Sequence, residues 1–253
     1  MNAHAPPATA IVTGGAKRIG AALARALAAD GWHVVIHCNT SVAEAEALAA
    51  ELGHATVVTA DLADPAAADT IIAAAAGLPP LRLLVNSASR FVYDRIEDFE
   101  SADFDTHMAI NLRAPALLSR AFAAACVADG EPALIVNLLD AKLSALNPDY
   151  FTYTLSKIGF AGLTELTARA YAPRIRCNAI APAVTLVSGP QSRENFAAVH
   201  GLNPLGRGVS VGEIVTALRF IIATPTLNAQ TLTLDGGQRL MGLPRDVAYM
   251  VDT

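Results

Sequence analysis

The stretch Thr13-Gly14-Gly15-Ala16-Lys17-Arg18-Ile19-Gly20 joins a strand-like apolar run, Ala8–Thr13, to a segment of helical periodicity, Ile19–Ala29. Glycines in a strand-to-helix turn let the backbone approach a diphosphate, and the free N–H groups and dipole of the helix N-terminus attract its charge. A tight turn that merely needs glycine is the alternative. The position of the turn after the first strand favours dinucleotide binding, with candidate contacts at Gly14, Lys17, Arg18, Ile19 and Gly20.

Apolar runs of strand length alternate with longer, alanine-rich segments of helical period along the rest of the chain. The runs are mostly continuously apolar, as expected for parallel strands covered on both faces. We therefore predict an α/β fold, a Rossmann-type doubly wound parallel sheet of about seven strands with helices on both faces, in a single domain over 1–253. The predicted strands are Ala8–Thr13, His33–His37, Thr56–Thr59, Leu81–Asn86, Ala133–Leu138, Arg176–Ala179 and Thr231–Leu234.

The predicted helices are Ile19–Ala29, Val42–Leu52, Ala66–Ala76, Ala102–Ala128, Tyr153–Ala170 and Gly212–Ala223. One segment, Val184–Asn203, mixes glycine, proline and polar residues without a clear period. It is predicted to be a flexible lid.

The composition describes a protein with a large core. Of the 253 residues, 53% are hydrophobic and 16% are charged, which excludes a disordered or collagen-like chain. Lys and Arg total 18 against 23 Asp and Glu, so the formal net charge is −5. This acidic excess provides no basic field for phosphates, and we expect no nucleic-acid partner.

Cysteine usage and the apolar segments bear on location. The three cysteines, Cys38, Cys126 and Cys177, lie far apart, which fits neither a disulfide framework nor a metal site and favours the reducing cytoplasm. Met1–Ala8 has no basic stretch followed by an apolar run, and stretches such as Ile71–Ala76 are too short to span a bilayer. We expect a cytoplasmic protein with no membrane partner and no metal.

The end of the second strand indicates which dinucleotide binds. No carboxylate stands where NAD-binding chains usually place one for the ribose hydroxyls; the chain has His37, Asn39, Thr40 and Ser41 there. Hydrogen-bond donors from this stretch, with positive charge from Lys17 or Arg18, favour the 2′-phosphate of NADP. Thr40 and Ser41 also suit a helix N-cap, and the two roles are compatible.

Two further loops follow the third and fourth strands, at the sheet edge where ligands bind in open α/β folds. They supply the candidate contacts Asp61, Leu62, Asn86, Ala88 and Ser89. Asp61 is equally suited to accept from an adenine amino group and to form the turn before Pro65.

Tyr153 and Lys157 start a predicted helix at positions i and i+4, which lie on one helical face. A nearby cation stabilises a phenolate and lowers the pKa of a tyrosine toward the range useful for acid–base catalysis. Two amphipathic side chains on a solvated face are the alternative for this pair alone. The preceding strand ends near Asp140, which lies 13 positions before Tyr153.

These motifs, with Asn86-Ser87-Ala88, Asn111 and Leu234-Asp235-Gly236-Gly237, resemble the short-chain dehydrogenase/reductase family over nearly the whole chain. The resemblance implies that Tyr153 donates a proton, that Lys157 holds the nicotinamide ribose and that Asn111 supports a relay water. It also implies a cofactor contact at Pro182 and a homotetramer formed through Ala102–Ala128 and Tyr153–Ala170.

Two departures from the family pattern resemble pteridine and dihydromonapterin reductases: Arg18 replaces a glycine, and Asp140 replaces the usual serine. His37 and Ser41 are similar to that branch as well. The resemblance makes Phe91 an aromatic platform for a pterin ring, although a phenylalanine after a strand is more often core. The implied substrate contacts are Arg18, Ser89, Phe91, Asp140 and Tyr153.

The sequence therefore predicts an NADPH-dependent reductase of a small-molecule pteridine, of dihydropterin, biopterin or folate type. Reduction of a C=N bond needs hydride at carbon and a proton at nitrogen, and Asp140 beside Tyr153 can pass a proton where a serine can only hydrogen-bond. The alternative is a short-chain carbonyl reductase or alcohol dehydrogenase acting on a ketone. A third hypothesis is a non-catalytic NADP-binding sensor, which has no need of a proton relay.

Overall fold

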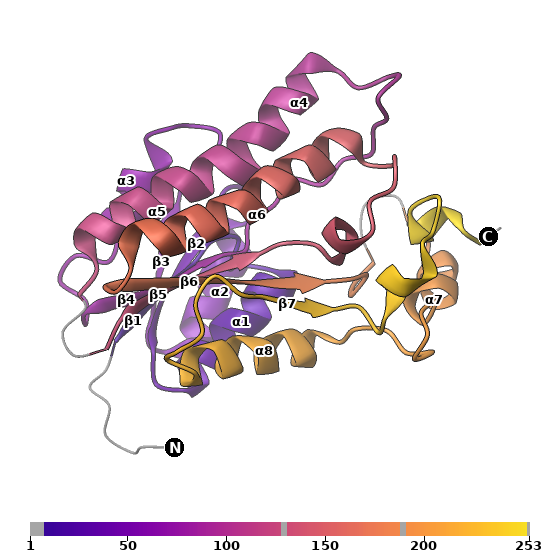
Figure 1. Cartoon of the computed structure of the whole chain (residues 1–253). Helices are drawn as coiled ribbons and strands as arrows, with labels where there is room; N and C mark the ends of the chain where they lie inside the picture. Colours follow the sequence, from indigo (N-terminus) through magenta and orange to yellow (C-terminus); the bar gives the residue numbers. More distant parts are fainter. Residues whose placement is uncertain (1–7, 128–130, 188–190, 252–253) are drawn as a thin grey trace.

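The parallel sheet of the computed structural model, which describes residues 8–127, 131–187 and 191–251, has the strand order β3-β2-β1-β4-β5-β6-β7 (Figure 1). Its strands are β1 (Thr9–Val12), β2 (His33–Cys38), β3 (Ala55–Thr59), β4 (Leu81–Asn86), β5 (Ala133–Leu138), β6 (Ile175–Pro182) and β7 (Thr231–Leu234). All seven predicted strands are confirmed, and β6 is longer at both ends than predicted. The prediction for Met1–Ala8 falls almost entirely outside the described residues.

The sheet has its topological switch point between β1 and β4. The chain runs outward from β1 to β3 and then returns to the other side of β1. Ile11 pairs with Val35 on one side and with Leu84 on the other, and it is fully buried. Because the loops after β1 and β4 leave in opposite directions, a crevice opens at the carboxyl ends of these strands.

Helices cover both faces of the sheet, which explains the continuously apolar strands. Figure 1 shows α1 (Arg18–Ala29), α2 (Val42–Leu52) and α8 (Val211–Ala223) on one face, and α3 (Ala67–Ala73), α4 (Ser101–Met108), α5 (Ala114–Ala125) and α6 (Phe151–Tyr171) on the other. Successive strand residues point to opposite faces. Val12 accordingly packs in the core beneath α1 and α8, and Ile11 packs in the core beneath α3 and α5.

The predicted helix Ala102–Ala128 is not one regular α-helix. A π-helical segment, Ala109–Arg113, separates α4 from α5, and the helical run ends at Ala125. Pro115 has no N–H for the carbonyl of Asn111 four residues earlier, which explains the departure from α geometry at this point. Ala128 lies outside the described residues.

The prediction of an irregular Val184–Asn203 is wrong in part, because this segment contains α7 (Arg193–His200). Ser192 caps α7 by accepting a hydrogen bond from the Asn195 N–H at 2.9 Å. Only Val199 of this helix is buried, so no apolar stripe marks it in the sequence. Positions 188–190 of the predicted lid lie outside the described residues.

Among the described helices, none has the length and apolar character needed to cross a membrane. The described residues also contain no cluster of three or more His, Cys, Asp or Glu side chains suited to a metal ion.

Arg176, on β6, anchors the C-terminal end of α8. Its buried guanidinium donates to the carbonyls of Ile221, Thr224 and Leu227 at 3.2, 3.1 and 2.9 Å. The last turn of α8 has no basic residue of its own. Arg176 therefore supplies the cation that pairs with the carbonyls left free at the end of the helix and with the negative end of the helix dipole.

We expect Arg176→Leu to lower the free energy of unfolding by about 2–4 kcal/mol, because three carbonyls in buried or partly buried contacts lose a charged donor. Urea denaturation measures this change. The matched control is Arg169→Leu, which removes an exposed arginine paired with Glu165 on α6. It should cost less than about 0.5 kcal/mol. Equal losses for the two variants would contradict the anchoring role.

Candidate functional site

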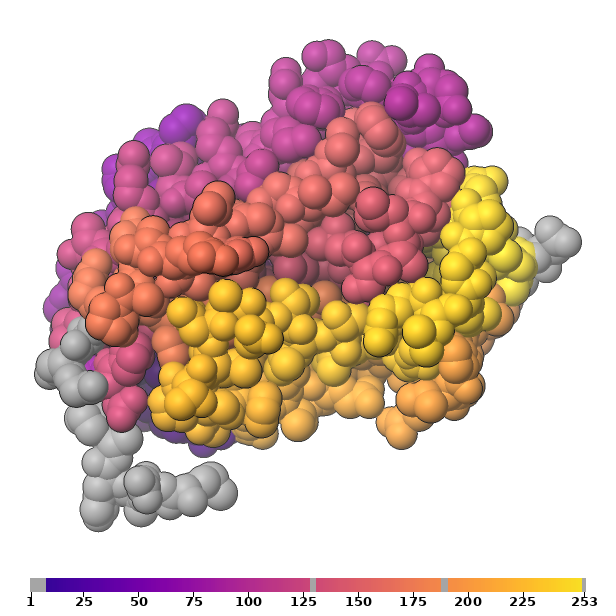
Figure 2. Space-filling view, viewed as in Figure 1, coloured from indigo at the N-terminus to yellow at the C-terminus, as the bar shows by residue number. Residues whose placement is uncertain are grey.

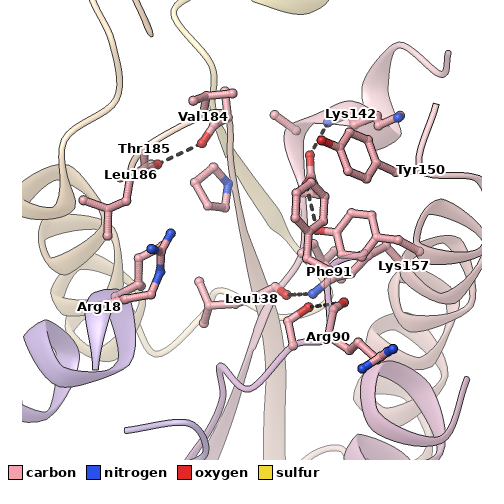
Figure 3. Close-up of a pocket in the computed structure, with 18 of the residues that line it drawn as sticks. Arg18, Arg90, Phe91, Leu138, Lys142, Tyr150, Lys157, Val184, Thr185 and Leu186 are labelled. Carbon is pink, nitrogen blue, oxygen red and sulfur yellow. Dashed lines mark hydrogen bonds between the residues drawn. The ribbon is translucent and has the colours of Figure 1, made fainter. Parts of the chain in front are cut away.

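A cleft of about 840 Å³ opens at the carboxyl ends of the strands, where the switch point lies. In Figure 3, Arg18 and Leu186 border one side of it, and Phe91, Tyr150 and Lys157 border the other. The predicted site residues that line it are Gly14, Lys17, Arg18, Ile19, Gly20, His37, Asn39, Asp61, Leu62, Ala88, Ser89, Phe91, Asp140, Tyr153, Lys157 and Pro182. Of the predicted residues, all of which the structure describes, Thr40, Ser41, Asn86 and Asn111 do not line it.

The loop after β1 lies in backbone contact with the loop after β4. Gly14 has φ +61°, and a Cβ added to it would lie 2.9 Å from the Cα of Ala88. Thr13 Oγ1 accepts hydrogen bonds from the N–H groups of Ser87 and Ala88 at 3.0 and 3.1 Å. Glycine at position 14 is therefore required both by conformation and by space.

His37 is buried and supports this loop. Its Nδ1 accepts from the Gly14 N–H at 3.2 Å, so Nε2 carries the proton that faces the carbonyl of Ala60 at 3.0 Å. Burial lowers the pKa of His37, which favours this neutral tautomer. With both nitrogens occupied by backbone groups, His37 is placed to position the loop, whereas the sequence predicted a direct cofactor contact.

Lys17 and Arg18 have different environments within the turn. Lys17 forms an exposed ion pair with Glu44, in the first turn of α2, at 2.7 Å. Arg18 has φ 55°, the left-handed region that explains why glycine is usual there, and its guanidinium donates to the Val187 carbonyl at 2.7 Å. Ser41 occupies the N-cap position of α2, as one interpretation predicted, but its side chain makes no cap hydrogen bond there.

Asp61 shows the turn-forming arrangement and also lines the cleft. Its Oδ1 accepts from the Ala63 N–H at 2.9 Å, which is the geometry of an Asx turn. Both roles proposed from the sequence are thus compatible with its position.

Asp140, Tyr153 and Lys157 meet where β5 ends and α6 begins. The Tyr153 hydroxyl donates to Asp140 Oδ2 at 2.7 Å. Asp140 is held in turn, because its Oδ1 accepts from the Lys142 N–H at 2.8 Å. Lys157 Nζ donates to the Leu138 carbonyl at 2.8 Å and lies 5.7 Å from the centre of the Tyr153 ring.

The net pKa shift of Tyr153 runs opposite to the direction expected from Lys157. Burial, followed by the adjacent Asp140 carboxylate, raises the pKa of Tyr153 well above its ordinary value. Burial also lowers the pKa of Lys157 to about 8. The hydroxyl of Tyr153 is therefore kept protonated, as a donor toward Asp140.

Asn111 and Asn86 are buried structural links. Asn111 Nδ2 donates to the Arg90 carbonyl at 2.9 Å and to Ser156 Oγ at 3.0 Å, and its Oδ1 accepts from the Arg90 N–H at 2.8 Å. The π-helical segment thus fixes the loop that carries Phe91. Asn86 Nδ2 donates to Asn137 Oδ1 at 2.9 Å and joins β4 to β5.

Aromatic rings form one wall of the cleft. Phe91 stacks on Tyr150 with ring centres 4.2 Å apart and meets the ring of Tyr153 edge-on at 4.7 Å. One face of the predicted Phe91 platform is therefore already covered. Tyr150 has φ 54°, an unusual conformation for a non-glycine residue, and the sequence analysis missed its part in this wall.

The C-terminal segment, residues 235–251 after β7, contributes a second group of residues that the sequence analysis missed. Figure 2 shows it lying against the segment before α6 and against α7. Arg245 Nε and Nη2 donate to the buried carboxylate of Asp149 at 2.8 and 2.7 Å, and the Asp246 N–H donates to the same carboxylate at 2.8 Å. Lys142, Arg245 and Asp246 line the cleft. No spacing in the sequence links Asp149 to residues almost a hundred positions later.

Comparison with known proteins establishes the family. The family model described as short chain dehydrogenase matches residues 8–196, and the chain belongs to that family of oxidoreductases. L-xylulose reductase of Mesocricetus auratus is 30% identical over 90% of this chain and 95% of the relative. D-threitol dehydrogenase of Mycolicibacterium smegmatis is 32% identical over 90% of this chain and 91% of the relative.

Solved structures are similar as well. FolM alternative dihydrofolate reductase 1 from Brucella suis, solved with NADP, is 39% identical with a TM-score of 0.84, covering 95% of this chain and 97% of that one. A short chain dehydrogenase from Burkholderia cenocepacia, also solved with NADP, is 29% identical with a TM-score of 0.84, covering 90% of this chain and 96% of that one.

We expect Lys157→Met to raise the free energy of unfolding at pH 7 by about 0–2 kcal/mol, because the substitution removes a buried cation. The pKa of Lys157 is lowered from 10.5 to about 8, so the folded state releases its proton first as the pH rises. Wild-type stability should therefore gain between about pH 8 and 10.5 relative to the variant. Urea denaturation at pH 7 and 9.5 measures this difference, and a variant that is less stable with an unchanged pH slope would contradict it.

Proposed function

We propose that the chain is an NADPH-dependent reductase of a pteridine, of dihydropterin, biopterin or folate type. The observation that carries the proposal is the Tyr153–Asp140 hydrogen bond of 2.7 Å beside the aromatic ring of Phe91. A carboxylate paired with the tyrosine suits reduction of a C=N bond, which needs a proton at nitrogen. The resemblance to the two Brucella alternative dihydrofolate reductases, at 38% and 39% identity, supports the same substrate class.

The residues around the glycine turn fit a dinucleotide phosphate. Gly14 and Gly20 allow no Cβ, because an added atom would lie 2.9 Å from Ala88 Cα and 2.1 Å from the Gly14 carbonyl oxygen. The N-terminus of α1 lies behind them and favours negative charge. Asn39 and Lys17 also line the cleft and would hold a 2′-phosphate. Similar chains solved with NADP support this choice of cofactor.

NADPH supplies the hydride when it is bound, and the side chains of the chain manage the proton. The Tyr153 hydroxyl is the donor that faces the cleft, and Asp140 holds it through Oδ2. Because burial makes the phenolate unfavourable, a proton given by Tyr153 has to be replaced. The Asp140 carboxylate carries no proton to spare, so it would first take one up from water in the cleft and then pass it to Tyr153 along their hydrogen bond. Lys157 and Asn111 support this pair, one from α6 and the other through the loop that carries Phe91.

A carbonyl reductase or alcohol dehydrogenase is the second candidate. It is favoured by the resemblance to L-xylulose reductase and D-threitol dehydrogenase. In that case Asp140 only orients Tyr153. The paired tyrosine, lysine and aspartate argue against a non-catalytic sensor. The cytoplasmic location and the homotetramer stay predictions; the exposed Ile158 and Leu166 of α6 are apolar side chains that such an assembly would cover.

Oxidation of NADPH in the presence of 7,8-dihydropterins or ketones tests the proposal. We expect turnover of a dihydropterin, reduced about 10²- to 10⁴-fold in kcat by Tyr153→Phe and also strongly reduced by Asp140→Ser, because both variants interrupt the proton path. Turnover of ketones alone, surviving Asp140→Ser, would replace the proposal with the second candidate. Tight NADPH binding without any turnover would favour the sensor.

Release of Lys17 from its ion pair with Glu44 should strengthen binding of the 2′-phosphate. We expect Glu44→Gln to lower the Kd for NADPH by about 2- to 5-fold and to leave that for NADH unchanged, because the exposed Lys17 loses its carboxylate partner. The matched control is Glu51→Gln, which frees Arg25 from a similar exposed pair on the same helix. Fluorescence titration at low and high salt measures the effect. An equal change for NADH would contradict a role in 2′-phosphate binding.

A further inference from the structure

The Lys142 and Asp246 side chains face the cleft beside the proposed proton donor, and neither has a part in the proton path. Lys142 lies in the short 3₁₀ helix Ala141–Ser144, which Asp140 precedes, and Asp246 belongs to the C-terminal segment. Their side chains are 8% and 19% exposed. Two opposite charges this far buried need a structural or functional reason.

The two groups form an ion pair without a direct hydrogen bond between them. Lys142 Nζ lies 3.7 Å from Asp246 Oδ2, which is beyond the usual range for N–H···O contacts. Lys142 Nζ donates one hydrogen bond to the Asp149 backbone carbonyl, and Asp246 Oδ1 accepts one from the Ala248 N–H at 3.1 Å. An ammonium has three donors and a carboxylate about four acceptor sites, so both retain hydrogen-bonding capacity. A single polar group can bridge such a gap.

The backbone that carries both side chains is anchored by hydrogen bonds. The Asp246 N–H and the Arg245 guanidinium are fixed on the buried carboxylate of Asp149. The Lys142 N–H is fixed on Asp140, at 2.8 Å. Binding to an arrangement that is already ordered costs little conformational entropy.

The charges around the pair select a neutral partner. Three carboxylates, Asp140, Asp149 and Asp246, face three cations, Lys142, Lys157 and Arg245, and Arg245 is already neutralised by its two-point contact with Asp149. This balance gives no attraction for a carboxylate or a phosphate. A hydroxyl group meets both requirements at once, because it donates to Asp246 and accepts from Lys142.

The position of the pair relates it to one part of the substrate. Asp140 touches both the Tyr153 hydroxyl and the backbone of Lys142, so the pair lies next to the point where the proton is delivered. In 7,8-dihydropterin reduction the carbon that receives hydride is bonded to the protonated nitrogen and carries the side chain. In ketone reduction the corresponding carbon also carries the substituents.

We propose that Lys142 and Asp246 form a hydroxyl subsite, which selects a substrate whose reduced carbon bears a hydroxylated alkyl chain. This inference rests on the proposed function for its position relative to the reacting carbon. It deepens that function by naming the substituent, a polyhydroxyalkyl chain in place of an alkyl or an anionic one. The C-terminal segment thereby has a recognition role.

The test compares two ligands that differ only in the hydroxyls, 6-methyl-7,8-dihydropterin and 6-(1,2,3-trihydroxypropyl)-7,8-dihydropterin. Kd is measured by calorimetry on protein loaded with NADP, and kcat and KM by NADPH oxidation. We expect Asp246→Asn and Lys142→Met to weaken the trihydroxypropyl ligand by about 10- to 50-fold, mainly in KM, and the methyl ligand by less than about 2-fold, as for hydrogen bonds to charged groups.

A structural role for the pair gives a different result. Arg245→Gln is the matched control, because it loosens the C-terminal segment and leaves Lys142 and Asp246 in the chain. It should weaken both ligands by similar factors. Equal losses for the two ligands in Asp246→Asn would show an anchor for the segment alone and would overturn the subsite.

The experiment also separates this inference from the proposed function. If the wild type binds or reduces neither pterin, the pteridine assignment fails, and the same variants are compared on L-xylulose and on the unhydroxylated 2-pentanone. A preference for the hydroxylated ketone that disappears in Asp246→Asn supports the subsite without the pteridine. Overturning results are an unchanged preference, or no discrimination by the wild type between hydroxylated and plain ligands of either class.

Discussion

The contact between Gly14 and Ala88 is the constraint on which the cleft depends. It brings the loop after β1 against the loop after β4 at the switch point of the sheet, where only a residue without Cβ fits at position 14. Thr13 and His37 fix the two loops from within the protein through hydrogen bonds to backbone groups. The glycine turn and the loop that carries Phe91 therefore form one rigid unit, and a dinucleotide and its substrate would be positioned by the same backbone contact.

Several energetically unfavourable features lie beside this unit. Arg18 and Tyr150 adopt left-handed conformations that cost about 1–2 kcal/mol each for an ordinary residue. Lys157 is a buried cation, and Tyr153 is held in its protonated form by burial and by Asp140. The fully buried strand residues on both faces of the sheet supply the compensating stability. Strain of this kind persists where the surrounding packing is strong enough to impose it.

The sequence predicted the seven strands and most helices because parallel strands covered on both faces leave long apolar runs. It also located the cleft residues that follow those strands. The π-helical segment at Ala109–Arg113 was missed because it depends on one proline inside a helical pattern, and α7 was missed because it buries only Val199. The predicted direction of the Tyr153 pKa shift was wrong, because spacing on a helix places Lys157 nearby but does not report burial or the Asp140 contact.

The residues around Asp149 could not be found from the sequence because their contacts are purely tertiary. The buried carboxylate of Asp149 accepts hydrogen bonds from Tyr93, Arg245 and the Asp246 N–H. The backbone carbonyl of Asp149 accepts a further one from Lys142 Nζ. Asp149 thus connects the C-terminal segment with the turn that carries Asp140 and with the start of α6. Since Asp140 and Lys142 share that turn, the carboxylate proposed to move a proton and the ammonium proposed to bind a hydroxyl cannot shift independently. Proton delivery and recognition of the neighbouring substituent are therefore set by one local geometry.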